Sequence, residues 1–324
     1  MTMWYPHRTS VRRVFREGGD LVQFWASTAF TPPAHLVPLA RAADEAGIHG
    51  ILMSDHIFFP KHRASRYPYS PYEDGRPIWE PETPWPDPWV TIGAMSAVTT
   101  NVCFATSIYI APARDLFTVA KQVGTAAVLS NNRVRLGLGA GWMKEEFDQT
   151  GQSFADRGRR LDEMIAALRT LWSGGWVEHH GTYYDFGPLM IEPAPSAPVP
   201  IWCGGHSDPA LRRAARLCDG WIGNAYSEED AAHYLGKLKA ELAAAGREGE
   251  PFDIVIGVYA PPTPDVVERW AAQGVTGLLC VPWFLDERSD DRDVAGAQQG
   301  TDLARKIDAI HRFAETVIAP LASA

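Results

Sequence analysis

Residues 133–173, RVRLGLGAGWMKEEFDQTGQSFADRGRRLDEMIAALRTLWS, contain the unit that decides the fold. The stretch begins with a short β-rich run over Val134–Gly139 and ends in a longer helical pattern over residues 155–173. In this second part, apolar side chains such as Leu161 and Leu168 recur at helical spacing. A strand followed by a long helix predicts a parallel sheet, because the helix carries the chain back to the edge where the next strand begins.

The same unit is repeated along the chain. Short apolar runs with β character occur at Leu21–Ser27, Gly50–Ser54, Val102–Ile110, Val134–Gly139, Pro200–Gly204, Gly220–Asn224, Phe252–Tyr259 and Gly277–Trp283. Helical patterns lie near residues 35–46, 88–99, 115–130, 155–173, 207–218, 228–246, 264–273 and 301–319. Eight strands that alternate with eight helices at even spacing favour a closed (β/α)8 TIM barrel over a doubly wound open sheet. We therefore expect one α/β barrel domain over residues 20–324, after an N-terminal extension over residues 1–19.

The composition argues against several classes of protein. The chain has 324 residues and a formal net charge of −9, whereas binding to nucleic acid or to an anionic membrane favours a basic surface. No run approaches the ~18 apolar residues of a membrane span, and Arg12-Arg13 lacks the apolar stretch that an export signal needs next. The four cysteines form no CxxC pair. We therefore expect reduced thiols, no metal site and a cytoplasmic protein.

The barrel prediction also indicates where the active site lies, since such sites form at the carboxyl ends of the strands. Residues 57–87 follow the second strand and are rich in proline and aromatic residues, which suits a stiff lid or substrate wall over the site. Residues 174–199 precede the fifth strand and belong to the opposite face. Their His179-His180 pair is therefore expected in an exposed hairpin and not in a metal site. Residues 286–300 are expected to form a second lid or a mobile loop.

Common catalytic motifs are missing from the sequence. It contains no GxSxG nucleophile elbow, no HExxH pair and no GxxxxGK[ST] phosphate loop. The glycines of Gly137–Gly141 follow a strand but lack the GxGxxG spacing of a dinucleotide-binding turn.

Four segments at predicted strand ends contain residues suited to binding or catalysis. They are Ser54–His56, Ala105–Pro112, Arg133–Phe147 and Ile201–Asp208. A histidine beside a carboxylate can bind a cofactor ring or move a proton, and closely spaced glycines allow a flat ligand to approach the backbone. A Gly-Gly turn before a helix offers backbone N–H groups to an anion. Each segment also has a plain structural explanation, as a strand cap, a buried strand, a tight turn or a helix cap.

Taken together, these four segments resemble the bacterial-luciferase-like superfamily, and in particular its branch that depends on coenzyme F-420, an 8-hydroxy-5-deazaflavin. The resemblance covers about residues 21–280 and is most specific at GLGAGWMKEEF and the helix after it. It implies that Asp55 and His56 face the cofactor ring and that Ser107-Ile108 is a non-proline cis peptide behind the ring. It further implies that Gly139 and Gly141 line the ring edge. Near the cofactor's phosphate-bearing chain it places Gly204, Gly205 and Ser207.

The resemblance implies hydride transfer between the deazaflavin and a small organic substrate, with His56 as the catalytic residue and a homodimer as the assembly. We expect Trp25 and Trp142 to form the substrate wall. Trp142 occupies the position of a proton-donating glutamate in the related sugar-phosphate dehydrogenases, which argues against that substrate class. Glu145 and Glu146 lie one helical turn further on, and either could replace that glutamate only if it turned inward; we expect them to cap or solvate a helix start.

Three alternatives to this function stay open. The first is an FMN-dependent monooxygenase of the same superfamily. The second is a barrel enzyme without a redox cofactor, and the third is a cofactor-binding protein without catalytic activity.

Overall fold

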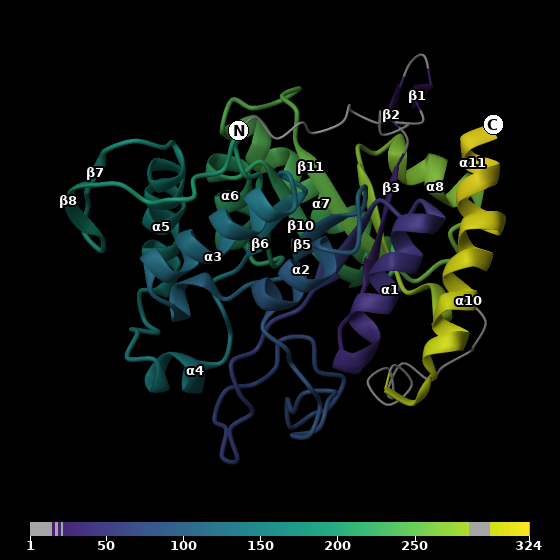
Figure 1. Ribbon diagram of the computed structural model, residues 1–324, viewed down its shortest axis with the longest axis horizontal. Helices are drawn as coiled ribbons and strands as arrows, with labels where there is room; N and C mark the ends of the chain where they lie inside the picture. Colours follow the sequence, from purple (N-terminus) through teal and green to yellow (C-terminus); the bar gives the residue numbers. More distant parts are fainter. Residues whose placement is uncertain (1–14, 17–18, 21, 285–298, 324) are drawn as a thin grey trace, which may run out of the picture.

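The computed structural model describes residues 15–16, 19–20, 22–284 and 299–323. Within these residues, eight parallel strands form a closed barrel in which each strand pairs with the next along the chain and the last pairs with the first (Figure 1). The strands are β3 (Gln23–Ser27), β4 (Gly50–Met53), β5 (Cys103–Thr106), β6 (Val134–Leu138), β9 (Ile201–Gly204), β10 (Gly220–Tyr226), β11 (Asp253–Val258) and β12 (Gly277–Cys280). The expected TIM barrel is therefore confirmed.

Helices surround the barrel and connect its strands (Figure 1). They are α1 (Pro33–Ala46), α2 (Pro88–Ser96), α3 (Leu116–Leu129), α5 (Arg157–Trp172), α6 (Asp208–Leu217), α7 (Glu228–Ala244), α8 (Pro264–Ala271), α10 (Leu303–Phe313) and α11 (Ala319–Ser323). Every predicted helical pattern corresponds to one of them. The short helix α4 (Lys144–Gln149), which lies between β6 and α5, was not expected as a separate element.

Two predicted strands end earlier than their apolar runs suggest. The third ends at Thr106, because the peptide bond Ser107-Ile108 is cis and a 3-10 turn, Ala111–Ala113, follows. The eighth ends at Cys280, before a second such turn at Pro282–Phe284. In both places a buried apolar run continues beyond the strand.

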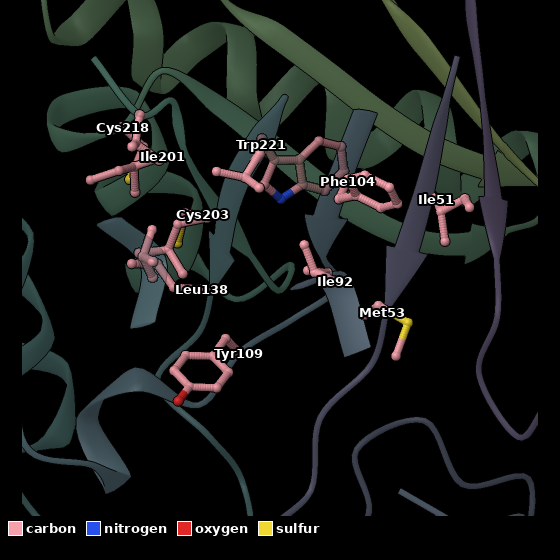
Figure 2. Close-up of a cluster of buried hydrophobic side chains, with 14 of the residues drawn as sticks. Ile51, Met53, Ile92, Phe104, Tyr109, Leu138, Ile201, Cys203, Cys218 and Trp221 are labelled. Atoms are coloured by element: carbon pink, nitrogen blue, oxygen red, sulfur yellow. The ribbon is translucent and has the colours of Figure 1, made fainter. Parts of the chain in front are cut away.

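The hydrophobic core has two parts, one on each side of the barrel wall. The larger part lies between strands and helices and includes Ile51, Phe104, Leu138 and Trp221, whose side chains are drawn in Figure 2. The smaller part fills the barrel interior. It consists of Trp25, Leu52, Ala105, Trp202, Ile222 and Val255.

The position of Trp25 contradicts its expected role as a substrate wall. Its side chain is fully buried and lies edge-on to Trp202, with ring centroids 5.0 Å apart. In the strand register Trp25 pairs with Gly50, the first residue of β4, and a Cβ atom on Gly50 would lie only 2.2 Å from the Trp25 ring. Trp25 therefore fills the end of the barrel interior that lies opposite the carboxyl ends of the strands.

The two long insertions lie where the barrel geometry predicts. The segment after β4 reaches the end of the molecule that also holds α4, whereas the hairpin of β7 (Val177–His180) and β8 (Asp185–Leu189) lies to one side, nearer the other end (Figure 1). In the hairpin the ring of His180 pairs with Asp185 at 2.6 Å. A second, small hairpin pairs β1 (Phe15–Arg16) with β2 (Gly19–Asp20).

Within the described residues, no cluster of His, Cys, Asp or Glu side chains is arranged to hold a metal ion. The helices of the same residues are all too short or too polar to cross a membrane. The expectations for residues 286–298, for Arg12-Arg13 and for most of the N-terminal extension lie outside the described residues.

Candidate active site

A cavity of about 1910 Å³ opens at the carboxyl ends of the barrel strands. Its lining comes from the ends of several strands, from the segment after β4, from the turn before α4 and from the starts of α5 and α6. The segment after β4 therefore covers the site, as its place in the chain predicts.

The floor of the cavity is formed around the cis peptide bond Ser107-Ile108, and both residues line the cavity. The Ile108 side chain packs against two glycines, one directly after β6 and one at the end of β9. A Cβ atom on Gly139 would lie 1.9 Å from Cδ1 of Ile108, and one on Gly204 would lie 2.4 Å from Cγ2. Gly204 lines the cavity but Gly139 does not. Gly139 thus makes room for Ile108, which corrects the expectation that it lines a ring edge.

Asp55 fixes the segment that follows the cis bond. Its buried carboxylate accepts hydrogen bonds from the backbone N–H of Ile110 at 3.0 Å and from the Arg114 guanidinium at 2.7 Å. Burial raises the pKa of Asp55 above its ordinary value, while Arg114 and the Ile110 N–H act against this rise. Asp55 borders the cavity, but both of its oxygens are bonded to protein groups, so it positions the floor.

His56 lies beside Asp55 and is bonded to a buried glutamate on α4. Nδ1 of His56 lies 3.1 Å from Oε1 of Glu146, and the side chains are 8% and 1% exposed. The same oxygen accepts the backbone N–H of Ile57 at 2.7 Å. Within the described part of the chain, Nε2 of His56 has no hydrogen-bond partner, and His56 lines the cavity. The pair therefore leaves one ring nitrogen free for a ligand.

The inward position of Glu146 contradicts the expectation that it solvates a helix start. Its neighbour Glu145 instead holds the segment after β4, because its Oε1 accepts the backbone N–H groups of Ala64 at 2.6 Å and Ser65 at 3.1 Å. Burial raises the pKa of Glu145, but hydrogen bonds from its own backbone and from Ser65 and Ala64 outweigh this and lower it below the ordinary value. The backbone N–H of Lys144 also bonds Oγ of Ser65, at 2.9 Å. Helix α4 thus fastens the covering segment at two points.

Aromatic rings surround His56 on its cavity side. The centroid of the His56 ring lies 4.8 Å from Trp85, 5.1 Å from Trp79 and 5.7 Å from Trp142. Tyr67 contacts both Trp79 and Trp142. Trp142 lines the cavity, as expected for a wall residue. We call Phe30, Tyr67, Ile78, Trp79, Trp85 and Trp142 the aromatic half of the cavity.

The opposite part of the lining carries three arginines, and the aspartates Asp156, Asp162 and Asp230 lie in the same part. Gly205 (φ +95°) and Ser207 lie there before α6, together with Arg157, Arg159 and Arg213. Arg157 donates to the carbonyl of Gly141 at 3.0 Å, and Arg213 is paired with Asp162. Arg159 is exposed and, among the described residues, has no bonded partner.

We call Gly205, Ser207, Arg157, Arg159 and Arg213 the arginine half of the cavity. Its arginines were not singled out from the sequence. Four arginines stand within residues 157–169, and the amphipathic pattern of α5 does not indicate which of them reach the cavity.

The covering segment spans the cavity as far as α7. The ring centroid of Tyr69 lies 5.3 Å from that of His206, and His206 stacks on Tyr234 at 4.5 Å with an interplanar angle of 4°. These rings connect the cover to the turn after β9.

Comparison with known proteins agrees with this architecture. The family described as luciferase-like monooxygenase matches residues 18–317. An uncharacterized protein of Mycobacterium tuberculosis is 35% identical over 301 residues, which cover 92% of this chain and 99% of that protein. The F420-dependent hydroxymycolic acid dehydrogenase of the same organism is 31% identical over 218 residues, covering 66% of this chain and 55% of that protein.

The fold agrees with solved structures as well. The coenzyme F420-dependent tetrahydromethanopterin reductase from Methanopyrus kandleri superposes with a TM-score of 0.67 at 15% identity, over 93% of this chain and 99% of that chain. The family match spans nearly the whole barrel, and the uncharacterized relative from M. tuberculosis is 35% identical over 92% of this chain. The chain therefore belongs to the luciferase-like monooxygenase family.

Proposed function

We propose that this protein is an oxidoreductase that transfers a hydride between a bound deazaflavin, coenzyme F-420, and a small organic substrate. The observation that carries the proposal is the meeting of two features at one cavity. Ser107 and Ile108 form the floor on which a ring would rest, and the His56–Glu146 pair leaves a ring nitrogen at the same cavity, where it would exchange a proton. A relative named as an F420-dependent dehydrogenase supports the choice of cofactor.

The lining fits such a cofactor. Ser107 and Ile108 would support the ring, with Gly204 allowing Ile108 to settle beneath it. A Cβ atom on Gly141 (φ +83°) would lie 2.7 Å from Ile110, so this turn also needs a glycine. The arginine half would hold a phosphate-bearing chain, since Arg159 is unpaired within the described residues and the first turn of α6 favours an anion. The deazaflavin supplies the hydride chemistry when bound.

The protein's own residues position the substrate and move a proton. Glu146 accepts from Nδ1 of His56, which fixes the ring orientation and leaves Nε2 to exchange a proton with a substrate oxygen. The negative charge of Glu146 stabilises the imidazolium that forms when Nε2 takes that proton. The aromatic half excludes water around this exchange.

A second candidate is an FMN-dependent monooxygenase, which the description of the family favours. The same floor and arginine half suit a ring with one phosphate. We further expect a homodimer in the cytoplasm, and light scattering after gel filtration would test the dimer.

Fluorescence titration of the purified protein with the deazaflavin and, separately, with FMN tests the proposal. We expect tight binding of the deazaflavin and weak binding of FMN. Exclusive binding of FMN would favour the monooxygenase, and binding of neither would contradict the redox function. A His56→Ala variant with full turnover and full cofactor affinity would remove His56 from the mechanism.

A further inference from the structure

The covering segment carries positive charge beside the aromatic half of the cavity. Arg66 lines the cavity and directly precedes Tyr67, whose ring contacts Trp79 and Trp142. The guanidinium carbon of Arg63 lies 5.8 Å from the centroid of the Trp142 ring, which is within the range of a cation–π contact. Two cations from the covering segment therefore border the rings that the cavity offers to a ligand.

A turn of the covering segment holds the Arg66 side chain in place. Nη2 of Arg66 donates to the carbonyl of Glu73, and the aliphatic part of the side chain lies over Gly75 (φ +69°), where an added Cβ atom would be only 2.9 Å from Cβ of Arg66. The backbone N–H of Tyr67 donates to the carbonyl of Gly75 at 2.8 Å, which fastens the turn. Nε and Nη1 of Arg66 have no hydrogen-bond partner among the described residues, so the guanidinium keeps donors for a ligand.

The charges of these two arginines are not neutralised by a carboxylate. Among the residues that the structure describes, no Asp or Glu oxygen lies within ion-pair distance of Arg63 or Arg66, whose guanidinium groups donate to backbone carbonyls. Glu145 is bonded to backbone N–H groups of the covering segment. In the arginine half, by contrast, Arg213 is paired with Asp162. An anion in the aromatic half would therefore meet uncompensated positive charge.

We infer that the substrate of this site is an apolar carboxylic acid, whose carboxylate binds Arg66 while its body lies against the aromatic half. The inference rests on the proposed function, because it names the substrate class of the same site. A planar guanidinium can donate two parallel hydrogen bonds to a carboxylate, and its single charge balances the single charge of this group. The apolar body is removed from water by the rings.

The test compares 2-naphthoate with 2-naphthamide, which share an apolar body and differ in charge. Titration calorimetry measures the binding of each to the deazaflavin-saturated protein. Because Arg66 is exposed, an ion pair there gains only modestly, and we expect 2-naphthoate to bind about 5-fold more tightly than the amide at low salt. This preference should fall as salt rises to about 0.5 M, whereas the affinity for the amide should change little. Equal affinities at low salt, or tighter binding of the amide, would overturn the inference.

Three variants assign the preference to Arg66. Arg66→Gln should abolish it, because the side chain stays polar but loses its charge, and Arg66→Lys should retain it, because the charge is kept. The control is Arg76→Gln, since Arg76 is exposed on the same segment, lies over the Tyr72 ring and is outside the cavity lining. A preference that persists in Arg66→Gln, or that Arg66→Lys loses to the same extent, would contradict the inference. Melting temperatures should match the wild type in all three variants.

The inference and the proposed function fail in different ways. Deazaflavin affinity should change less than about three-fold in Arg66→Gln, because the arginine half would hold the phosphate-bearing chain of the cofactor. A larger loss would place that chain at Arg66, and the inferred substrate contact would then be wrong while the proposed cofactor stands. If the deazaflavin does not bind at all, the proposed function is wrong, and calorimetry on the protein alone still compares the two probes.

Discussion

The charge of Glu146 can be removed without disturbing its hydrogen bonds. One oxygen, Oε1, accepts from both His56 (3.1 Å) and the Ile57 N–H (2.7 Å), so the amide oxygen of glutamine can occupy the same place. Glu146→Gln therefore isolates the electrostatic contribution of the carboxylate to the histidine. Glu146→Ala would not, because it leaves the Ile57 N–H without its acceptor and opens a cavity.

The expected loss follows from the geometry of this pair. Two unit charges 3.1 Å apart interact by roughly 5 kcal/mol at an effective dielectric constant of 20, which is an upper limit. Only the part that differs between ground state and transition state affects the rate. Loss of the partner that orients a metal-bound histidine typically costs about 10–100-fold, and we take the same range for the partner of His56. We therefore expect kcat/KM to fall by this factor, which corresponds to about 1.4–2.7 kcal/mol.

The assay measures steady-state turnover with the deazaflavin and a small organic substrate. Cofactor affinity and melting temperature should stay close to those of the wild type, since the hydrogen bonds persist. Asp148→Asn is the matched control, because Asp148 lies on the same helix, is exposed and pairs with Lys144. In a His56→Ala background, Glu146→Gln should cause little further loss. Full activity of Glu146→Gln, or an independent loss in the double variant, would refute the proposed pairing.

Three further outcomes are expected. Gly204→Ala should weaken deazaflavin binding about 10-fold or more, because the new Cβ would lie 2.4 Å from Ile108, whereas Gly236→Ala has open space and should bind normally in the same titration. Because the pKa of Glu145 is lowered, its hold on the cover is complete above the ordinary value of 4.5 and is lost as the pH falls through the lowered value. Protection of residues 57–87 against hydrogen exchange should therefore fall there, and Glu145→Ala, which removes the acceptor of the Ala64 and Ser65 N–H groups, should lack this protection at every pH. Burial raises the pKa of Asp44, but hydrogen bonds from residues 100–102 outweigh this effect and lower the pKa below 3.8. Asp44→Ala should therefore lower the free energy of unfolding in urea by about 2 kcal/mol at neutral pH. This difference should shrink as the pH falls below 3.8.

The barrel could be predicted from the sequence because its signal is repeated. Each strand is buried on both faces and each helix on one, so apolar runs and helical patterns alternate. The ends of the strands were less certain. Val102–Ile110 is apolar throughout, and this pattern does not reveal that the strand ends at Thr106, before the cis peptide bond. The family resemblance, and not the periodicity, predicted that bond.

The direction of side chains on these strands was harder to predict, because strands buried on both faces are apolar throughout. A strand with one polar face shows by its alternation which residues point inward. The strand Gln23–Ser27 has buried residues on both faces, so its pattern does not show whether Trp25 points to the cavity or to the opposite end of the barrel. The pairing of Trp25 with Gly50, which only the folded structure reveals, shows that its side chain lies at the end of the barrel opposite the cavity.

The sequence also does not show which way Glu146 points on its short helix. The structure shows why Glu146 and its neighbour Glu145 make different contacts. Helix α4 has six residues, too few to display a helical period. Adjacent residues on a helix point about 100° apart, so when Glu146 turns inward to His56, Glu145 is directed to the cover at Ala64 and Ser65. One short helix therefore holds both His56, for which we propose proton exchange, and the segment that covers the cavity. A change in the cover that moves α4 should also alter the orientation of His56, so substitutions at Ser65 are expected to affect turnover and not only substrate affinity.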